Sequence, residues 1–281
     1  MLGGTYRSTM TAGDQLHVGS LHRYPVKSML GETVTTLTVG YDGVEGDRRL
    51  ALIDGETGRV ASAKQARLWR QLLKCTASIE GEHVRVRLPD GTEVRPGQDG
   101  FDDALSALVS RPVRVATRRP AGASLERANP EQVLDRGLDA VVDAPLLELG
   151  EATPGDSFVD LAPIHAITTA TLQRIGTEAE RYRPNIVVVT PPGYPAYTEN
   201  DWAEKTFAVG TARLKGMGAT PRCVIPTLEH GDLGRAVHAL RTPATENLVD
   251  SFGLGRLPCA GAYFEVVTEG TISLGDPISQ V

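Results

Sequence analysis

Cysteine is scarce in this chain of 281 residues, and its three copies lie far apart. Cys75, Cys223 and Cys259 form no C-x-x-C pair, so a structural zinc site or an iron–sulfur cluster of the usual spacing is excluded. The low, odd count also excludes a small scaffold held together by disulfides. A cysteine with a chemical role in this protein must therefore act alone.

The chain also lacks long apolar runs and an excess of positive charge. No window approaches the roughly 18 uninterrupted apolar residues of a transmembrane helix, and the opening MLGGTYRSTMTAGDQ has no apolar signal core. We therefore expect a cytoplasmic protein with no membrane partner. The formal net charge of −6 argues against nucleic acid as a partner, although it leaves room for a local basic pocket.

Several catalytic motifs are missing as well. GMGATP and GLGRLP each lack the third glycine of a dinucleotide-binding loop, and no G-K-[ST] follows a glycine loop, which argues against standard nucleotide binding. H-E-x-x-H and G-x-S-x-G do not occur. The sequence therefore supports neither a zincin nor a hydrolase with a nucleophile elbow.

What is present in the first half is a series of short β-rich runs separated by turn residues. The predicted strands are TVTTLTV, DRRLALID, HVRVRL and PVRVA. AKQARLWRQLL and DDALSALVS are predicted helices, and Asp102 is placed to cap the second one. Residues 118–140 show no clean helix or strand period, so we interpret them as a connection between two units.

The second half predicts further strands and one well-marked helix. Thr168 can cap that helix, with Ile167 before it and Leu172 at the fourth helical position as a hydrophobic staple. The predicted strands are PNIVVVT, TFAVG, ARLKGM, CVIPTL, AYFEVV and TISLGD. The fold class predicted from these patterns is mainly β with short helices (α+β).

Four stretches place polar or basic groups beside turns and predicted strands: YPVKS, EGDRRLALID, ERYRPNIVVV and TPRCVIPT. Lys27 and Ser28 can donate to one anion, and Arg183 and Asn185 can emerge together at a strand entrance. The alternatives are a surface lysine, strand capping by the Arg183 and Asn185 pair, and a solvated ion pair for Arg48. If these cations form an exposed anion pocket, alanine substitutions should change ligand occupancy more than stability.

Cys223 also has two interpretations. Val224 and Ile225 look like strand interior, so the thiol can be a small buried residue entering a strand. The alternative is a chemically active thiol beside the Arg222 guanidinium. Two other polar residues have simpler interpretations: His165 as a satisfied core residue, and the Trp202 of ENDW as a cover for the core.

Taken together and in order, eight stretches resemble one family. They are YPVKS, GDRRLALID, GRVASAKQARLWRQL, FVDLAPIHAITTATL, RYRPNIVVV, ENDW, PRCVIPT and GAYFEVVTEGTISLGDPI, and they cover residues 21 to 279. The chain resembles the molybdenum-cofactor sulfurase C-terminal (MOSC) family, and within it the mitochondrial amidoxime-reducing components and their bacterial relatives. Lys64 departs from this resemblance, because the amidoxime reducers usually have arginine there.

The resemblance implies a two-domain architecture and a bound cofactor. We expect a flexible tail at 1–16, a MOSC N-terminal β-barrel domain at 17–120 and a MOSC β-barrel domain at 121–281, with the molybdenum cofactor (Mo-molybdopterin) between the two barrels. Cys223 would be the catalytic thiolate ligand to molybdenum, which suits a soft sulfur donor, and the Arg222 charge would favour the thiolate. The residues that would line the cofactor are Lys27, Ser28, Arg48, Thr168, Thr169, Arg183, Asn185, Arg222 and Tyr263.

The function that the resemblance implies is a molybdenum-dependent oxidoreductase. It would reduce small N-hydroxylated, N-oxide or related oxo substrates with electrons from a separate donor protein carrying flavin, haem or an iron–sulfur centre. The alternative is a non-catalytic carrier of the molybdenum cofactor or of persulfide sulfur on Cys223.

Overall fold

The computed structural model describes residues 15–150 and 153–281, and the fold is built mainly of strands. The expected flexible tail at 1–16 lies almost wholly outside the described residues. A nine-stranded sheet has the order β19-β14-β15-β17-β12-β13-β1-β2, with β16 paired to β17. Its strands are β1 (His17–Arg23), β2 (Glu32–Val34), β12 (Ile164–Thr168), β13 (Ile186–Val189), β14 (Thr206–Val209), β15 (Ala212–Pro221), β16 (Leu248–Asp250), β17 (Arg256–Thr268) and β19 (Ile278–Gln280).

Four smaller sheets and several short helices complete the fold. The smaller sheets contain β3 (Thr36–Gly40), β4 (Gly43–Val44) and β18 (Gly270–Ser273); β5 (Ala51–Asp54) and β9 (Val113–Ala116); β6 (Thr76–Glu80), β7 (His83–Arg87) and β8 (Glu93–Val94); and β10 (Ser124–Glu126) and β11 (Leu146–Glu148). The α-helices are α1 (Ala66–Trp69), α2 (Phe101–Val109), α3 (Pro130–Arg136), α4 (Thr169–Ile175) and α5 (His238–Glu246). Single 3₁₀ turns are η2 (Arg70–Lys74), η3 (Ala179–Arg181), η4 (Thr198–Trp202) and η5 (Ile225–Thr227). The predicted class, mainly β with short helices, is confirmed.

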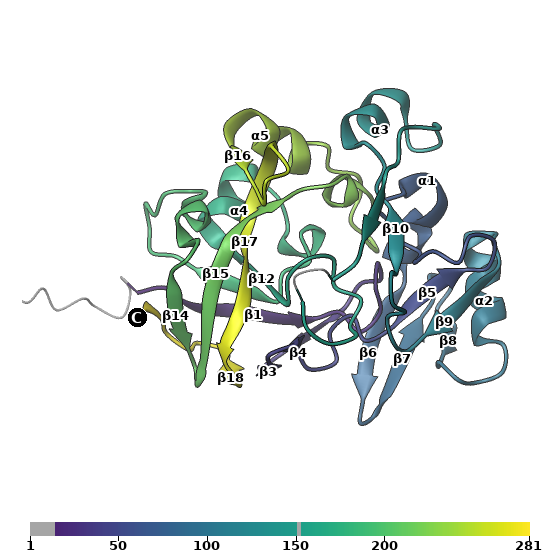
Figure 1. The fold of residues 1–281 in the computed structure, drawn as a ribbon, viewed down its shortest axis with the longest axis horizontal. Coiled ribbons are helices and arrows are strands. Elements are labelled where there is room, and N and C mark those ends of the chain that lie inside the picture. The colour runs from purple at the N-terminus through teal and green to yellow at the C-terminus, as the bar shows by residue number, and fades with distance from the viewer. Residues whose placement is uncertain (1–14, 151–152) are drawn as a thin grey trace, which may run out of the picture.

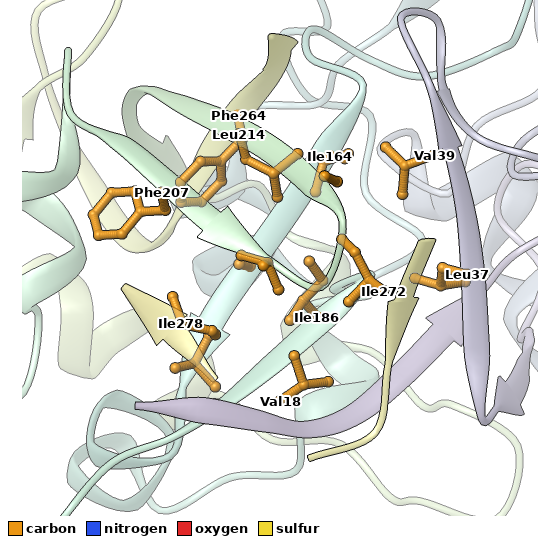
Figure 2. Close-up of a cluster of buried hydrophobic side chains, with 14 of the residues drawn as sticks. Val18, Leu37, Val39, Ile164, Ile186, Phe207, Leu214, Phe264, Ile272 and Ile278 are labelled. Atoms are coloured by element: carbon orange, nitrogen blue, oxygen red, sulfur yellow. The ribbon is translucent and has the colours of Figure 1, made fainter. Parts of the chain in front are cut away.

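Strands from the two halves of the sequence share one sheet and one core. β1 pairs antiparallel with β13, and β18 pairs with β3. Figure 1 shows β1 running across the molecule, from the region of β14, β15 and β17 toward the region of β5 and β9. The largest hydrophobic cluster combines Val18 and Leu37 with Ile164, Ile186 and Phe264, whose side chains converge in Figure 2. The predicted domain boundary at 120 stays a prediction, and these contacts show that the first strands are packed into the second half.

The ends of the main sheet approach each other near the C-terminus. His17 forms an isolated antiparallel bridge with Pro277, and Ile278 N donates to Leu16 O at 2.8 Å. These contacts favour the expected barrel closure, which stays a prediction because β2 and β19 are not joined in a ladder among the described residues.

The two helix caps predicted from the sequence, at Thr168 and Asp102, have different outcomes. Thr168 caps α4, because its Oγ1 accepts from Thr171 N at 3.1 Å, and Ile167 and Leu172 share one hydrophobic cluster, so the predicted cap and staple are confirmed. The helix predicted at DDALSALVS is confirmed as α2, but Asp102 does not cap it. Its Oδ1 instead accepts from Val115 N at 2.9 Å and joins the helix to β9.

Residues 118–140 contain β10 and α3, and α3 begins where Asn129 Oδ1 accepts from Glu131 N and Gln132 N, with Pro130 at the first helical position. Their interpretation as a connection between two units stays a prediction. The predicted strand at CVIPTL is wrong. β15 ends at Pro221, Cys223 follows in an irregular segment, and η5 starts at Ile225.

Candidate functional site

A cavity of about 360 Å³ collects most of the predicted site residues. Eight of the ten predicted site residues line it: Lys27, Ser28, Arg48, Arg183, Asn185, Arg222, Cys223 and Tyr263. They come from both halves of the sequence, which fits a site formed between two units. A larger depression of about 790 Å³ contains none of them and mixes acidic with basic residues, so we base the site on the smaller cavity.

Backbone conformation marks the same positions. Ser28, Arg48 and Arg183 have φ values of 63°, 45° and 55°, in the left-handed region that residues with a Cβ seldom adopt. Seven non-glycine residues within the described ranges have positive φ, and these three of them line the cavity as predicted. Such strain persists only where the surrounding structure enforces it, and it concentrates at functional sites.

Two lysines share one carboxylate on the cavity wall. Lys27 Nζ donates to Phe158 O at 2.8 Å and to Asp160 Oδ1 at 2.7 Å, while Lys64 Nζ lies 3.1 Å from the same oxygen. Burial lowers the pKa of Lys27 to about 8. Burial alone would raise the pKa of Asp160, but the two lysine charges hold it well below its usual range.

Arg48 and Arg183 are held by backbone carbonyls and one carboxylate. Arg48 pairs with Asp47 and donates to Arg183 O at 3.0 Å, and Arg183 donates to Met29 O. Burial, and then the neighbouring Arg48 charge, lower the pKa of Arg183 to about 10. Two guanidinium groups therefore lie close together in a largely desolvated place.

Cys223 is a half-buried free thiol in this cavity. The Arg222 guanidinium donates to Ala260 O and Tyr182 O and contacts His165 Nε2, so these interactions go to groups other than Cys223. The interpretation of Cys223 as a buried strand residue is wrong, because the residue is neither in a strand nor fully buried. Its predicted activation by Arg222 stays a prediction.

His165 is a buried and satisfied residue, as predicted, and it also lines the cavity. Burial, and then the charge of Arg222, hold the pKa of His165 well below its usual range, so the ring is neutral. The Tyr263 ring lies edge-on to His165 at 5.8 Å, and burial raises the pKa of Tyr263 to about 12. The hydroxyl of Tyr263 therefore keeps its proton at neutral pH.

Asn185 and Ser28 combine a structural role with a place at the cavity. Asn185 Oδ1 accepts from His165 N at 3.2 Å, and its Nδ2 donates to His22 O at 3.4 Å. Ser28 Oγ accepts from Ala63 N at 3.0 Å, which leaves its own hydroxyl proton free to donate elsewhere.

Thr168 and Thr169 are not brought to the cavity. Thr168 is fully buried, caps α4 and binds Glu199, while Thr169 Oγ1 contacts Thr190 Oγ1 at 3.0 Å. The structure gives no basis for placing them against a ligand in this cavity, so we leave both out of the site. Trp202 of η4 packs into the core, as predicted, and its ring centroid lies 5.4 Å from that of Phe207.

The cavity wall is cationic although the protein is acidic. Its lining includes two carboxylate residues, Glu148 and Asp160, and seven basic residues: Lys27, Arg48, Lys64, Arg127, Arg181, Arg183 and Arg222. The formal charge of the whole chain is −6. Positive groups gathered in a concave site attract an anion and have little effect elsewhere on the surface.

Sequence reasoning missed Asp160 and Arg127 as cavity residues and noted Lys64 only as a departure from the family. Asp160 stands inside the stretch FVDLAP, which carried the family resemblance, but its contact with Lys27 spans 133 positions of sequence. No local pattern reports such a contact.

No described helix is long and apolar enough to cross a membrane, and the described residues hold no group of three or more His, Cys, Asp or Glu suited to a metal ion.

Comparison with known proteins matches both halves of the chain. The MOSC N-terminal beta barrel domain matches residues 15–108, and the MOSC domain matches residues 157–279. Mitochondrial amidoxime-reducing component 1 of Homo sapiens is 26% identical over an alignment that covers 93% of this chain and 82% of that protein.

Two other relatives match less completely. Mitochondrial amidoxime-reducing component 1 of Mus musculus is 28% identical over 43% of this chain, and the match spans 37% of the mouse protein. Molybdenum cofactor sulfurase of Oryza sativa subsp. japonica is 25% identical over 85% of this chain, but over only 31% of its own length.

Proposed function

The chain belongs to the MOSC-domain family, and from that premise we propose that it is a molybdenum-cofactor-binding oxidoreductase. It reduces small N-hydroxylated, N-oxide or related oxo substrates and takes electrons from a separate donor protein. The observation that carries this proposal is the cationic cavity around the half-buried free thiol of Cys223. The name of the human relative agrees with the reduction, and the name of the rice relative agrees with a link to the molybdenum cofactor.

The cavity residues fit a phosphate-bearing pterin cofactor. Lys27, Lys64, Arg48 and Arg183 supply charged donors for a phosphate group, since arginine forks and lysine ammonium groups are the usual phosphate partners. Cys223 Sγ would be the soft ligand for molybdenum. When bound, the cofactor supplies the two-electron redox chemistry, and the protein contributes position and electrostatics.

Three other side chains of the cavity would contact the substrate. Reducing an N–OH group to N–H consumes two electrons and two protons and releases water. The neutral Tyr263 hydroxyl can donate a hydrogen bond to a substrate oxygen in the same cavity. Leu146 and Leu254, which are exposed and also line the cavity, would contact the apolar part of a substrate.

The site needs both halves of the chain. Lys27, Arg48 and Lys64 come from the proposed N-terminal barrel domain at 17–120, and Arg183 and Cys223 come from the proposed MOSC barrel domain at 121–281. An isolated fragment of residues 130–281 would lack three of these groups and would also lose β1, which pairs with β13.

Metal analysis tests the proposal directly. The protein would be purified from a host that makes the molybdenum cofactor and assayed with benzamidoxime and a reduced artificial electron donor. Near-stoichiometric molybdenum together with turnover is the expected result. Stoichiometric cofactor without turnover of any oxo substrate would favour the carrier function instead, and absence of both molybdenum and pterin would refute cofactor binding altogether.

A further inference from the structure

The guanidinium groups of Arg48 and Arg183 meet on one aromatic ring. The Arg48 Cζ atom lies 4.5 Å from the centroid of the Tyr24 ring, and the Arg183 Cζ atom lies 4.4 Å from it. The two guanidinium carbons cannot be farther apart than the sum of these distances. Tyr24 is 3% exposed, so water screens this cluster poorly.

Two like charges so close together in a buried place repel each other. The backbone of both arginines is already in the left-handed region, and Arg48 N donates to Tyr24 O at 2.7 Å, so this contact fixes the chain beside the ring. The negative face of an aromatic ring attracts a guanidinium, and this attraction grows when the pair is desolvated. The Tyr24 ring is therefore a common support that offsets part of the repulsion.

The hydroxyl of Tyr24 has no part in this support. Its oxygen is buried and has no hydrogen-bond partner among the described residues. Burial raises the pKa of Tyr24 above its usual value, so the ring stays uncharged at neutral pH. A phenylalanine at this position would keep the aromatic face and lose no hydrogen bond.

We propose that Tyr24 is a positioning residue of the anion site, whose ring holds Arg48 and Arg183 so that both can bind one phosphate group. The proposal rests on the proposed function in one respect only, since the phosphate is taken to be that of the cofactor. Tyr24 does not itself line the cavity, so it acts through the two arginines that do.

The test measures binding of inorganic phosphate to the cofactor-free, full-length protein by calorimetry at pH 7. Tyr24→Phe should keep the wild-type affinity within about twofold, and Tyr24→Leu should lower it about tenfold, because the two arginines would lose the shared ring that holds them. Phe101→Leu is the matched control, because Phe101 is equally buried, packs in a hydrophobic cluster that does not include Tyr24, and does not line the cavity. It removes a similar aromatic volume and should leave phosphate affinity unchanged.

Each remaining outcome has a definite meaning. If Tyr24→Leu binds phosphate as tightly as the wild type, or if Phe101→Leu weakens binding as much, the positioning role is overturned and the proposed function stands. If Tyr24→Phe weakens binding as much as Tyr24→Leu, the hydroxyl and not the ring is responsible, which also overturns it. A wild type that binds no phosphate removes the anion site, while molybdenum content still decides the proposed function independently.

Discussion

Two polar clusters of the structure both contain residues that the sequence suggested as cofactor ligands. One joins Thr168, Thr171 and Glu199, and the other joins Lys27, Lys64 and Asp160. The two clusters differ in how completely the hydrogen bonds and charges of their members are matched within the cluster. Glu199 accepts from Thr168 N at 2.8 Å, from Thr168 Oγ1 at 2.9 Å and from Thr171 Oγ1 at 2.8 Å, and it is fully buried.

The second cluster is not balanced in this way. Two ammonium groups share a single carboxylate oxygen at the wall of a cavity that further arginines also line. Positive charge and hydrogen-bond donors are left over, and Asp160 keeps a side-chain exposure of 36%. Burial and polarity alone therefore do not identify a binding site. Unmatched donors facing a cavity do, because a self-satisfied cluster gains nothing from a ligand.

The largest expected effect comes from Cys223, which lies on the cavity with the unbalanced cluster. Cys223→Ser should lower reductase activity to below about 1% of wild type, a loss of more than about 2.7 kcal/mol of transition-state stabilisation, because a hydroxyl is a far poorer molybdenum ligand. The pterin should be largely retained through other contacts. Activity assays and pterin fluorescence after release measure the two effects.

Cys259→Ser is the matched control. Cys259 is fully buried in β17 and does not line the cavity, so its serine variant should stay active apart from a modest loss of stability. Near-normal activity of Cys223→Ser would show that the thiol is not the metal ligand.

Glu199 should matter for stability and not for binding. Glu199→Ala leaves Thr168 N and two threonine hydroxyls without their buried acceptor, which should lower the free energy of unfolding by about 3 kcal/mol. Urea denaturation measures this change, with the exposed Glu265 replaced by alanine as a control that should move stability by less than about 0.5 kcal/mol. A folded Glu199→Ala protein that no longer binds cofactor would break the distinction between the clusters.

Lys27 should show the reverse behaviour. Lys27→Met removes a buried charge whose pKa burial has lowered, and Asp160 still has Lys64 at 3.1 Å, so no carboxylate is left unpaired. The unfolding free energy of the cofactor-free protein should change by less than about 1 kcal/mol. Phosphate affinity should fall about tenfold, roughly the effect of one lost charge-assisted contact. Unchanged affinity with a large loss of stability would make Lys27 structural.

Local patterns in the sequence predicted the local features of the fold. The Thr168 cap was predictable because a threonine before a helical period satisfies a backbone N–H within three residues. The Cys223 segment was not, since Val224 and Ile225 favour a strand while Pro226, which lacks an N–H, lies inside the 3₁₀ turn η5.

Contacts between residues far apart in the sequence limit how much of the candidate site could be predicted. Lys27 and Arg183 were predicted as exposed pocket charges, but the structure buries them at 5% and 8% exposure, against Phe158 O and Met29 O respectively. Exposure is therefore not the reason why removing one of these charges would change stability little. For Lys27 the reason is that Asp160 keeps its ion pair with Lys64. Arg48 and Tyr24 likewise meet only once the fold has formed.

The smallest expected effect is a pH dependence of anion affinity, which involves only the cluster of Lys27, Lys64 and Asp160. Burial lowers the pKa of Lys27 from 10.5 to about 8, whereas Asp160 stays ionised because its pKa is held below the usual range. Lys27 is charged below about pH 8 and neutral above it, so anion affinity should fall by about threefold between pH 7 and pH 9. Sulfate is the suitable probe, since its own charge is constant over that range.

The lowered pKa of Lys27 affects stability in the opposite direction, because stability should rise with pH while anion affinity falls. A protonated Lys27 costs free energy only in the folded state, so the cofactor-free protein should become more stable as the pH rises from about 8 toward 10.5. Lys27→Met, which carries no charge at any pH, should lose both trends, and Glu199→Ala should retain both. A sulfate affinity that stays flat from pH 7 to pH 9 in the wild type would mean that Lys27 does not contact the anion, and the cluster would then be as structural as the one around Glu199.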